Sequence, residues 1–387
     1  MSNTLNTFKV NKKRIINTFL ELVSLDSSPG NERAVARVIK NKLGKLPCTI
    51  REDQAGKKIG GSTGNIIVDF SPSPGQEENP VLLLSAHMDK ISPGTGSKPR
   101  ISGDYITSAN DGSLGADDLA GVTGIIEGLR NIQKQGIKRG PIKIIFTVAE
   151  EEGLQGAKCL NDRELKDCDY GAVFDAEGDI GTIIYRAPYK MKFNAVIRGQ
   201  SAHAGIEPGK GINAIKIASQ AISNMNLGVI DEETTANIGV IRGGVARNVV
   251  PDLIELQGEV RSHSMDKLKE VIQEMKKITQ KAVHQYRGEV DFDISLLYQG
   301  FSLNKNNPFV KYTAGVVREL NLPLRFQVSG GGNDACIFNN RGVPALNLGT
   351  GIENAHSDNE KIKKENLYRL VKFIISLLTN ADRIDDV

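Results

Sequence analysis

Residues 82–90 read LLLSAHMDK, an apolar run that ends in a histidine and an aspartate. A short apolar run of this length is typical of a strand buried within a sheet. Two further runs, IKIIFTV at 142–148 and GAVF at 171–174, are also followed by acidic residues. These stretches predict buried strands of an α/β sheet at residues 81–85, 142–147 and 171–175, each with polar side chains at or just beyond its carboxyl end.

Amphipathic helix patterns surround these strands. Helices are predicted at residues 11–24, 31–43, 118–135, 308–320 and 361–380. Further strands are predicted at residues 65–70, 181–186, 325–328 and 345–348. Short β-rich runs between amphipathic helices predict an α/β sandwich around a largely parallel sheet.

The middle of the chain has a different pattern. Strands are predicted at residues 191–197, 236–242, 253–261 and 289–297, with helices at 208–225 and 264–286. This order is that of a small α+β domain with a split βαβ arrangement. We therefore predict an inserted α+β domain at residues 189–298, within an α/β domain formed by residues 1–188 and 299–387.

Composition excludes some classes of protein. The 387 residues carry a formal net charge of only +3 and no dense basic stripe, so we expect no nucleic-acid partner. No stretch approaches the roughly 20 apolar residues that span a bilayer, so we expect no membrane partner. The N-terminus does not resemble a signal peptide, and none of the four cysteines has CxxC spacing. A cytoplasmic protein with reduced thiols is the expectation.

Histidine and acidic residues follow the predicted strands. His87 has Asp89 two residues later, and a metal-bound histidine usually gives its second ring nitrogen to such an acceptor. The alternative is a loop histidine beside a surface aspartate. Asp117 and Asp118 open a predicted helix, where acids either cap the helix or bridge two cations.

Three glutamates, Glu150–Glu152, directly follow the strand at 142–147. They are either a solvated surface run or the site of a metal ligand beside a general base, because a cation offsets their repulsion. Asp175 and His356 also follow apolar strands. Imidazole and oxygen ligands without cysteine suit Zn²⁺, Mn²⁺ or Co²⁺, and a shared carboxylate would set two metals about 3.5–4 Å apart.

Taken in order along the chain, these motifs resemble the M20 metallopeptidase family, and within it the peptidase T (tripeptidase) branch. The motifs are AHMD, GADDLAG, AEEEGLQGA, VFDAEG, GQSAHAG, ARNVVPD, SGGGNDA and ENAHS, between residues 86 and 357. The resemblance implies the two-domain fold predicted above, with the inserted domain serving as a lid and for dimerisation. It also implies two divalent metal ions per chain, expected to be Zn²⁺, with Mn²⁺ or Co²⁺ as alternatives.

The resemblance assigns a role to each matching position. The implied metal ligands are His87, Asp117 (bridging), Glu151, Asp175 and His356. The implied catalytic residues are Glu150 as general base, Asp89 orienting His87, and His203 binding the scissile carbonyl oxygen. The implied substrate-binding residues are Arg247, Asn248 and Asn333.

Two points stay open in this alignment. Leu119 stands where the family often has lysine, so the alignment at this point also allows Asp118 in place of Asp117 as the bridging ligand. The glutamate run also allows a shifted pair, Glu151 as base and Glu152 as ligand.

The activity implied is hydrolysis of short peptides by metal-activated water. One alternative is an amidohydrolase that acts on N-acyl amino acids or dipeptides with the same metal centre. Another is a non-catalytic binding protein on a peptidase scaffold, which the complete set of ligands and base disfavours. The exact substrate, the physiological metal and the oligomeric state are not determined by the sequence. We expect a homodimer through the inserted domain, in which His203 acts either within its own chain or across the dimer.

Overall fold

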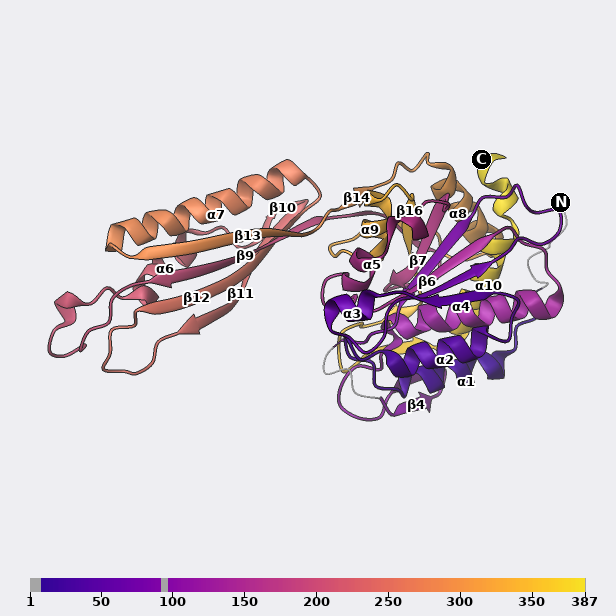
Figure 1. The fold of residues 1–387 in the computed structure, drawn as a ribbon, viewed down its shortest axis with the longest axis horizontal. Coiled ribbons are helices and arrows are strands. Elements are labelled where there is room, and N and C mark those ends of the chain that lie inside the picture. The colour runs from indigo at the N-terminus through magenta and orange to yellow at the C-terminus, as the bar shows by residue number, and fades with distance from the viewer. Residues whose placement is uncertain (1–7, 92–96, 387) are drawn as a thin grey trace. The chain divides into compact units, whose positions relative to one another are not determined.

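The computed structural model describes residues 8–91 and 97–386, and the chain divides into two compact units (Figure 1). The first unit comprises the chain up to Arg186, Ser302–Ser329 and the chain from Asn333 onward. The second unit comprises Ala187–Phe301 together with Gly330–Gly332. A role of the second unit as a lid or dimerisation domain remains a prediction.

A nine-stranded mixed sheet forms the centre of the first unit. Its four central neighbours, β6, β3, β7 and β16, are parallel to one another, whereas the outer pairings of β2 with β6 and β8 with β16 are antiparallel. The predicted α/β fold is therefore confirmed, with antiparallel strands added at both sides. In spatial order the strands are β1 (Thr49–Glu52), β2 (Ile66–Phe70), β6 (Ile142–Thr147), β3 (Leu82–His87), β7 (Tyr170–Ala176), β16 (Ala345–Gly349), β8 (Thr182–Ala187) and β14 (Phe301–Ser302), with β15 (Arg325–Val328) paired to β8.

Helices bury this sheet, and every residue of β3 is buried. The long helix α4 contacts β3 and β7 and packs against α1 and α10 (Figure 1). The absence of a side chain at Gly124 allows α4 to approach α10 closely. A Cβ at this position would lie only 2.9 Å from side-chain carbons of Leu370 and Ile374. The helices of this unit are α1 (Lys12–Val23), α2 (Arg33–Leu43), α3 (Ala55–Ile59), α4 (Ala116–Gln135), α5 (Gln155–Cys159), α8 (Pro308–Glu319), α9 (Asp334–Asn340) and α10 (Lys364–Thr379).

A second, four-stranded sheet lies in the same unit. Its order is β17 (Ile352–Glu353), β18 (Lys361–Lys363), β5 (Tyr105–Ser108) and β4 (Pro99–Ser102). The helix predicted from residue 361 instead begins at Lys364, because the three residues before it pair with β5. β17 and β18 enclose the loop that carries His356.

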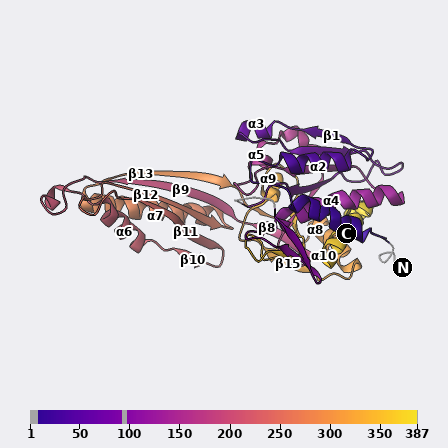
Figure 2. The same cartoon turned by 90° about the horizontal axis from the view of Figure 1, so that it is seen from below.

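The second unit is a five-stranded antiparallel sheet with two helices that contact each other and the same strands (Figure 2). Alternate residues of β9, namely Phe193, Ala195 and Ile197, belong to the hydrophobic core beneath these helices. The helix predicted from residue 208 begins only at Ala214, where Asn213 caps it. In spatial order the strands are β10 (Gly228–Asp231), β11 (Thr234–Gly243), β12 (Leu253–Ser262), β9 (Tyr189–Arg198) and β13 (Glu289–Tyr298), and the helices are α6 (Ala214–Asn224) and α7 (Met265–Tyr286).

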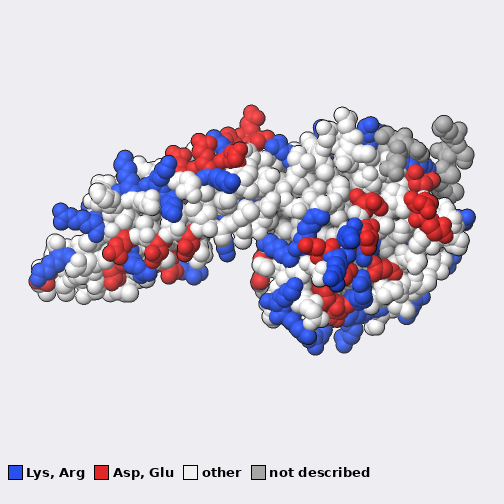
Figure 3. Space-filling model, turned by 45° about the horizontal axis from the view of Figure 1, so that its top comes forward, with Lys and Arg blue, Asp and Glu red and all other residues white. Residues whose placement is uncertain are grey.

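Lysine and arginine side chains are interspersed with aspartate and glutamate side chains on the face shown in Figure 3. Among the described residues, the longest apolar helical stretches fall short of what a membrane crossing requires.

Candidate metal centre

Four adjacent parallel strands of the large sheet bring the predicted ligands together. His87 ends β3, Asp175 lies near the end of β7, and the glutamate run follows β6. His356 lies in the loop that follows β16 and β17. Because parallel neighbours end at the same edge, these side chains, far apart in the sequence, meet where ligands collect in open α/β sheets.

Asp117 lies between the two histidines. Its Oδ1 is 3.2 Å from Nε2 of His87, and its Oδ2 is 3.0 Å from Nε2 of His356. His87 Nε2 is also 3.6 Å from Oδ1 of Asp175, and His356 Nε2 is 2.9 Å from Oε1 of Glu151. Each oxygen of one carboxylate therefore faces a separate histidine–acid pair, which is the geometry of a ligand shared by two cations.

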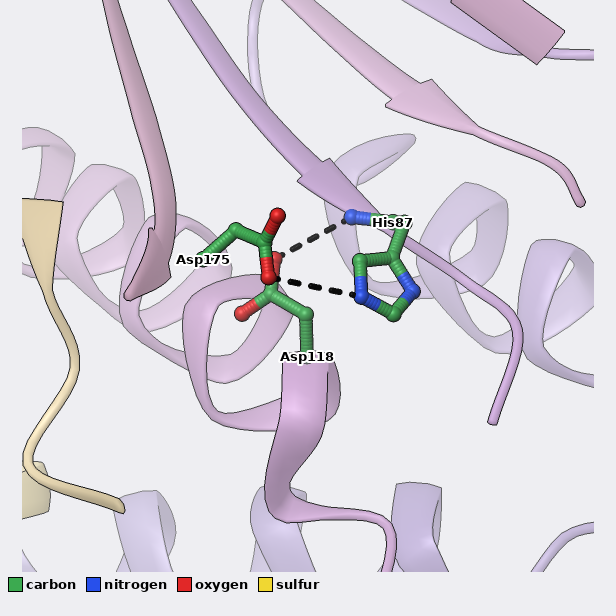
Figure 4. A group of neighbouring side chains, drawn as sticks. All are labelled: His87, Asp118 and Asp175. Carbon is green, nitrogen blue, oxygen red and sulfur yellow. Dashed lines mark hydrogen bonds and ion pairs between the residues drawn. The ribbon is translucent and has the colours of Figure 1, made fainter. Parts of the chain in front are cut away.

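The tautomer of His87 supports metal binding at Nε2. Nδ1 lies 3.0 Å from the backbone carbonyl oxygen of Asp89, which only accepts hydrogen bonds, so Nδ1 carries the proton. The lone pair of Nε2 then faces the carboxylate oxygens of Asp117 and Asp175 (Figure 4 shows Asp175). Lone pairs that face one another need a positive charge between them, which either a proton or a divalent cation supplies. Burial lowers the pKa of His87, but its contacts with Asp117, Asp175 and Asp89 outweigh this and raise the pKa well above its ordinary value.

The carboxylate of Asp118 has different partners from that of Asp117. Its Oδ2 accepts a hydrogen bond of 3.1 Å from the backbone N–H of His87 (Figure 4). Its Oδ1 accepts one of 3.2 Å from the N–H of Gly121. The side chain therefore ties the start of α4 to the end of β3. These contacts favour Asp117 over Asp118 as the bridging ligand.

The three consecutive glutamates have three different environments. Glu150 is buried, Glu151 is mostly buried and reaches His356, and Glu152 is exposed. Oε1 of Glu151 is buried and lies 2.9 Å from Nε2 of His356, so the two atoms are placed where both could ligate one cation. This arrangement favours Glu150 as base and Glu151 as ligand over the shifted pair.

Asp89 is fully buried and fixes both sides of the cluster. Its Oδ1 accepts from the N–H of Glu150 at 3.0 Å and its Oδ2 from the N–H of Glu151 at 3.1 Å. The same carboxylate lies 3.4 Å from Nδ1 of His87. Asp89 therefore contacts both His87 and the glutamate run, which favours its predicted role of orienting His87.

The cluster carries many negative charges in a buried place. Burial raises the pKa of Glu150 well above its ordinary value, and repulsion from Asp175 adds to this effect. Burial also raises the pKa of Asp175 to about 7, although its contact with His87 opposes the shift. Cations at this position would offset the repulsion, so the nitrogen and oxygen donors present fit divalent metals such as Zn²⁺, Mn²⁺ or Co²⁺.

Two buried acids that were not predicted as site residues accept hydrogen bonds from segments next to the proposed ligands. Glu360 accepts hydrogen bonds from the N–H groups of Gly115 at 2.7 Å and Asp117 at 2.9 Å, and from the hydroxyl of Ser113. Asp334 accepts a 2.6 Å hydrogen bond from the hydroxyl of Thr147 at the end of β6. Glu360 lies outside all the motifs found in the sequence, whereas Asp334 belongs to the motif SGGGNDA, in which only Asn333 had been assigned a role.

The remaining predicted residues lie outside the cluster. His203, Arg247 and Asn248 belong to the second unit, and all three are exposed. Asn333 is buried in the first unit, where its side-chain oxygen accepts from the N–H of Ala335 at 3.0 Å and caps α9. Substrate contacts by Arg247, Asn248 and Asn333 remain predictions.

The geometry of His203 is suited to hydrogen-bond donation. Its Nδ1 accepts from the backbone N–H groups of Gly205 at 3.2 Å and Ile206 at 3.1 Å. The neutral ring therefore carries its proton on Nε2, which is the nitrogen left to face a ligand.

A cluster of histidines and carboxylates at the carboxyl edge of an α/β sheet is typical of metal-dependent hydrolases. The chain belongs to peptidase family M20/M25/M40, whose family description matches residues 83–380. The predicted family and the predicted class of enzyme, a peptide hydrolase, are thereby confirmed.

Two solved structures and one further protein sequence are similar to this chain over nearly its whole length. A tripeptidase from Staphylococcus aureus subsp. aureus Mu50 is 38% identical, with a TM-score of 0.92 and coverage of 97% of this chain and 99% of that one. The aminopeptidase PepT from Bacillus cereus ATCC 10987 is 34% identical, with a TM-score of 0.88 and coverage of 96% and 99%. The uncharacterized protein YqjE of Bacillus subtilis (strain 168) is 37% identical over 96% of this chain and 99% of its own length.

Proposed function

We propose that this protein is a two-metal aminopeptidase that removes the N-terminal residue from short peptides, with tripeptides as the preferred substrates. The observation that carries the proposal is the Asp117 carboxylate, whose two oxygens face His87 and His356 separately. The similar structures named as an aminopeptidase and a tripeptidase support the choice of substrate. A cytoplasmic location remains our expectation from the cysteine pattern.

The proposed ligand sets share Asp117. His87 and Asp175 would complete one site, and Glu151 and His356 the other. We propose Zn²⁺ as the metal, with Mn²⁺ or Co²⁺ as alternatives, because the donors are nitrogen and oxygen without sulfur. Such cations lower the pKa of water to about 7 and polarise a carbonyl oxygen.

Glu150 would move the proton during hydrolysis. Its carboxyl is buried beside the proposed ligand Glu151, and cations at the cluster would offset the repulsion that raises its pKa, which would leave it able to take a proton from the attacking water. Glu150 would then give this proton to the leaving amine. The Nε2–H group of His203 would donate a hydrogen bond to the carbonyl oxygen as negative charge develops there.

A panel of peptides tests the proposed substrate class. We expect purified protein supplied with Zn²⁺, Mn²⁺ or Co²⁺ in turn to release the N-terminal amino acid from tripeptides. N-acetylated tripeptides should have a kcat/KM at least about 10²-fold lower, because groups built to bind the free amine would lose their partner. Chromatography of the products identifies the bond cleaved. Preference for N-acyl amino acids would instead support an amidohydrolase, and no hydrolysis of any member would refute the peptidase assignment.

The His203→Ala variant should lose about 10²–10³-fold in kcat, as expected when one donor to a developing oxyanion is removed. Its metal content should remain unchanged, because His203 lies outside the ligand cluster. His203→Gln, which keeps an N–H donor, should recover part of the loss. The exposed His284 on α7 provides the control, and His284→Ala should retain full activity. A His203→Ala variant with native kcat would exclude the proposed role.

Mixing of inactive subunits distinguishes the two ways in which His203 can reach the substrate. If the protein is a dimer and His203 acts across it, a heterodimer of His203→Ala and Glu150→Ala subunits has one intact site. That heterodimer should have up to half the activity of a native dimer. If no activity returns after proven subunit exchange, or if the protein is a monomer, His203 acts within its own chain.

A further inference from the structure

The segment that carries the proposed base is held through its backbone. Three consecutive N–H groups, those of Ala149, Glu150 and Glu151, donate to two buried carboxylates. Asp89 accepts the second and third, as described above, and Oε1 of Glu32 accepts the first at 2.9 Å. Glu32 precedes α2 and is fully buried, 117 residues away from Ala149 in the sequence.

The conformation of Ala149 explains why this contact matters. Ala149 has a φ of 47°, in the left-handed region that non-glycine residues rarely adopt. A residue in such a conformation costs about 1–3 kcal/mol and persists only where its surroundings fix it. The left-handed residue turns the chain directly after β6, immediately before Glu150. A change in its backbone angles would therefore displace the Glu150 side chain.

Glu32 does not serve as a side-chain cap for the helix that follows it. It occupies the N-cap position of α2, yet its side chain forms no capping hydrogen bond there. Its Oε1 also accepts from the N–H of Gly30 at 2.8 Å, whereas its buried Oε2 has no partner among the described residues. Burying a carboxylate with one unpaired oxygen destabilises a fold. Stability of the fold therefore does not explain why a glutamate is buried at position 32.

We propose that Glu32 is a positioning residue for catalysis, which holds the Ala149–Glu151 backbone so that Glu150 stands correctly against the water it deprotonates. This inference rests on the proposed role of Glu150 as the general base. The functional part of Glu32 is the acceptor oxygen Oε1 at its present position, because that atom alone receives both N–H groups.

Two conservative variants separate the position of the acceptor from the charge. Glu32→Gln keeps an oxygen at the Oε1 position and places its amide nitrogen where Oε2 has no partner, so kcat should stay within about twofold of native. Glu32→Asp keeps the charge but withdraws the acceptor by one methylene group, and kcat should fall about 10- to 100-fold, with little change in KM. The metal content of both variants should equal that of the native protein.

Glu127 provides a matched control for a buried carboxylate. It is fully buried in α4 and pairs with Arg14 and Arg130, away from the cluster. Glu127→Asp and Glu32→Asp should both lower the Tm, but Glu127→Asp should leave kcat unchanged at temperatures well below the Tm. With this result for Glu127→Asp, a lower kcat in Glu32→Asp could not be attributed to a general loss of stability.

A double-mutant cycle shows whether Glu32 acts through Glu150. Glu32→Asp should lower kcat in the native background and have almost no further effect in the Glu150→Gln background, because the positioned group is already lost. Native kcat in Glu32→Asp, equal losses in the Asp and Gln variants, or additive losses with Glu150→Gln would each overturn the positioning role. Native activity in Glu150→Gln alone would instead refute the proposed base, so the two failures are distinguishable.

Discussion

Replacing Glu150 with glutamine is expected to lower kcat by about 10²–10⁴-fold, the usual contribution of a general acid–base group. The amide has nearly the same shape as the carboxyl but cannot accept the proton from the attacking water. The variant should retain the native amount of metal, because Glu150 is not among the groups that meet at the two histidine nitrogens. Steady-state kinetics on a tripeptide and elemental analysis of the same preparation test both parts.

The neighbouring residue provides the control for this prediction. Glu151 Oε1 lies 2.9 Å from His356 Nε2, so Glu151→Gln should weaken metal binding. Its activity should be restored in part by a higher concentration of free metal, which should not help Glu150→Gln. Exchanged phenotypes would mean that Glu151 is the base.

The sequence predicted the parts of the fold that depend on local pattern. The strands predicted at residues 81–85 and 191–197 have clear apolar patterns, and both form, with bounds of Leu82–His87 and Tyr189–Arg198. The sequence places Lys361–Lys363 in the helix that follows it, because one apolar residue between two lysines is too short a stretch to establish a period. The strand forms because β5 supplies its partners, and a single sequence does not contain this information.

In the candidate site, too, local sequence pattern predicted some residues, whereas others depend on tertiary contacts. The proposed ligands could be found because each follows a strand or belongs to a motif with a fixed spacing. Glu32 and Glu360 could not be found, because their importance comes from burial against segments distant in the sequence. The choice of Asp117 over Asp118 also required the structure, since only the contacts with His87 and Gly121 show what Asp118 does.

Removal of metal should have the largest effect of any single treatment. We expect a chelator to abolish peptide hydrolysis, because the cluster would lose the charge that activates water and polarises the substrate. Activity should return when a divalent cation is added back, and the fold should be retained because both units have their own hydrophobic cores. Circular dichroism before and after chelation checks that loss of activity is not loss of structure.

The most direct test of the two-metal account is a titration of the chelated protein with Zn²⁺, Mn²⁺ or Co²⁺, in which tripeptide hydrolysis and bound metal are measured on the same samples. The account predicts no activity without metal and full activity as binding approaches two ions per chain, the number that a bridging Asp117 implies. Full activity in protein shown by elemental analysis to contain no metal would contradict it.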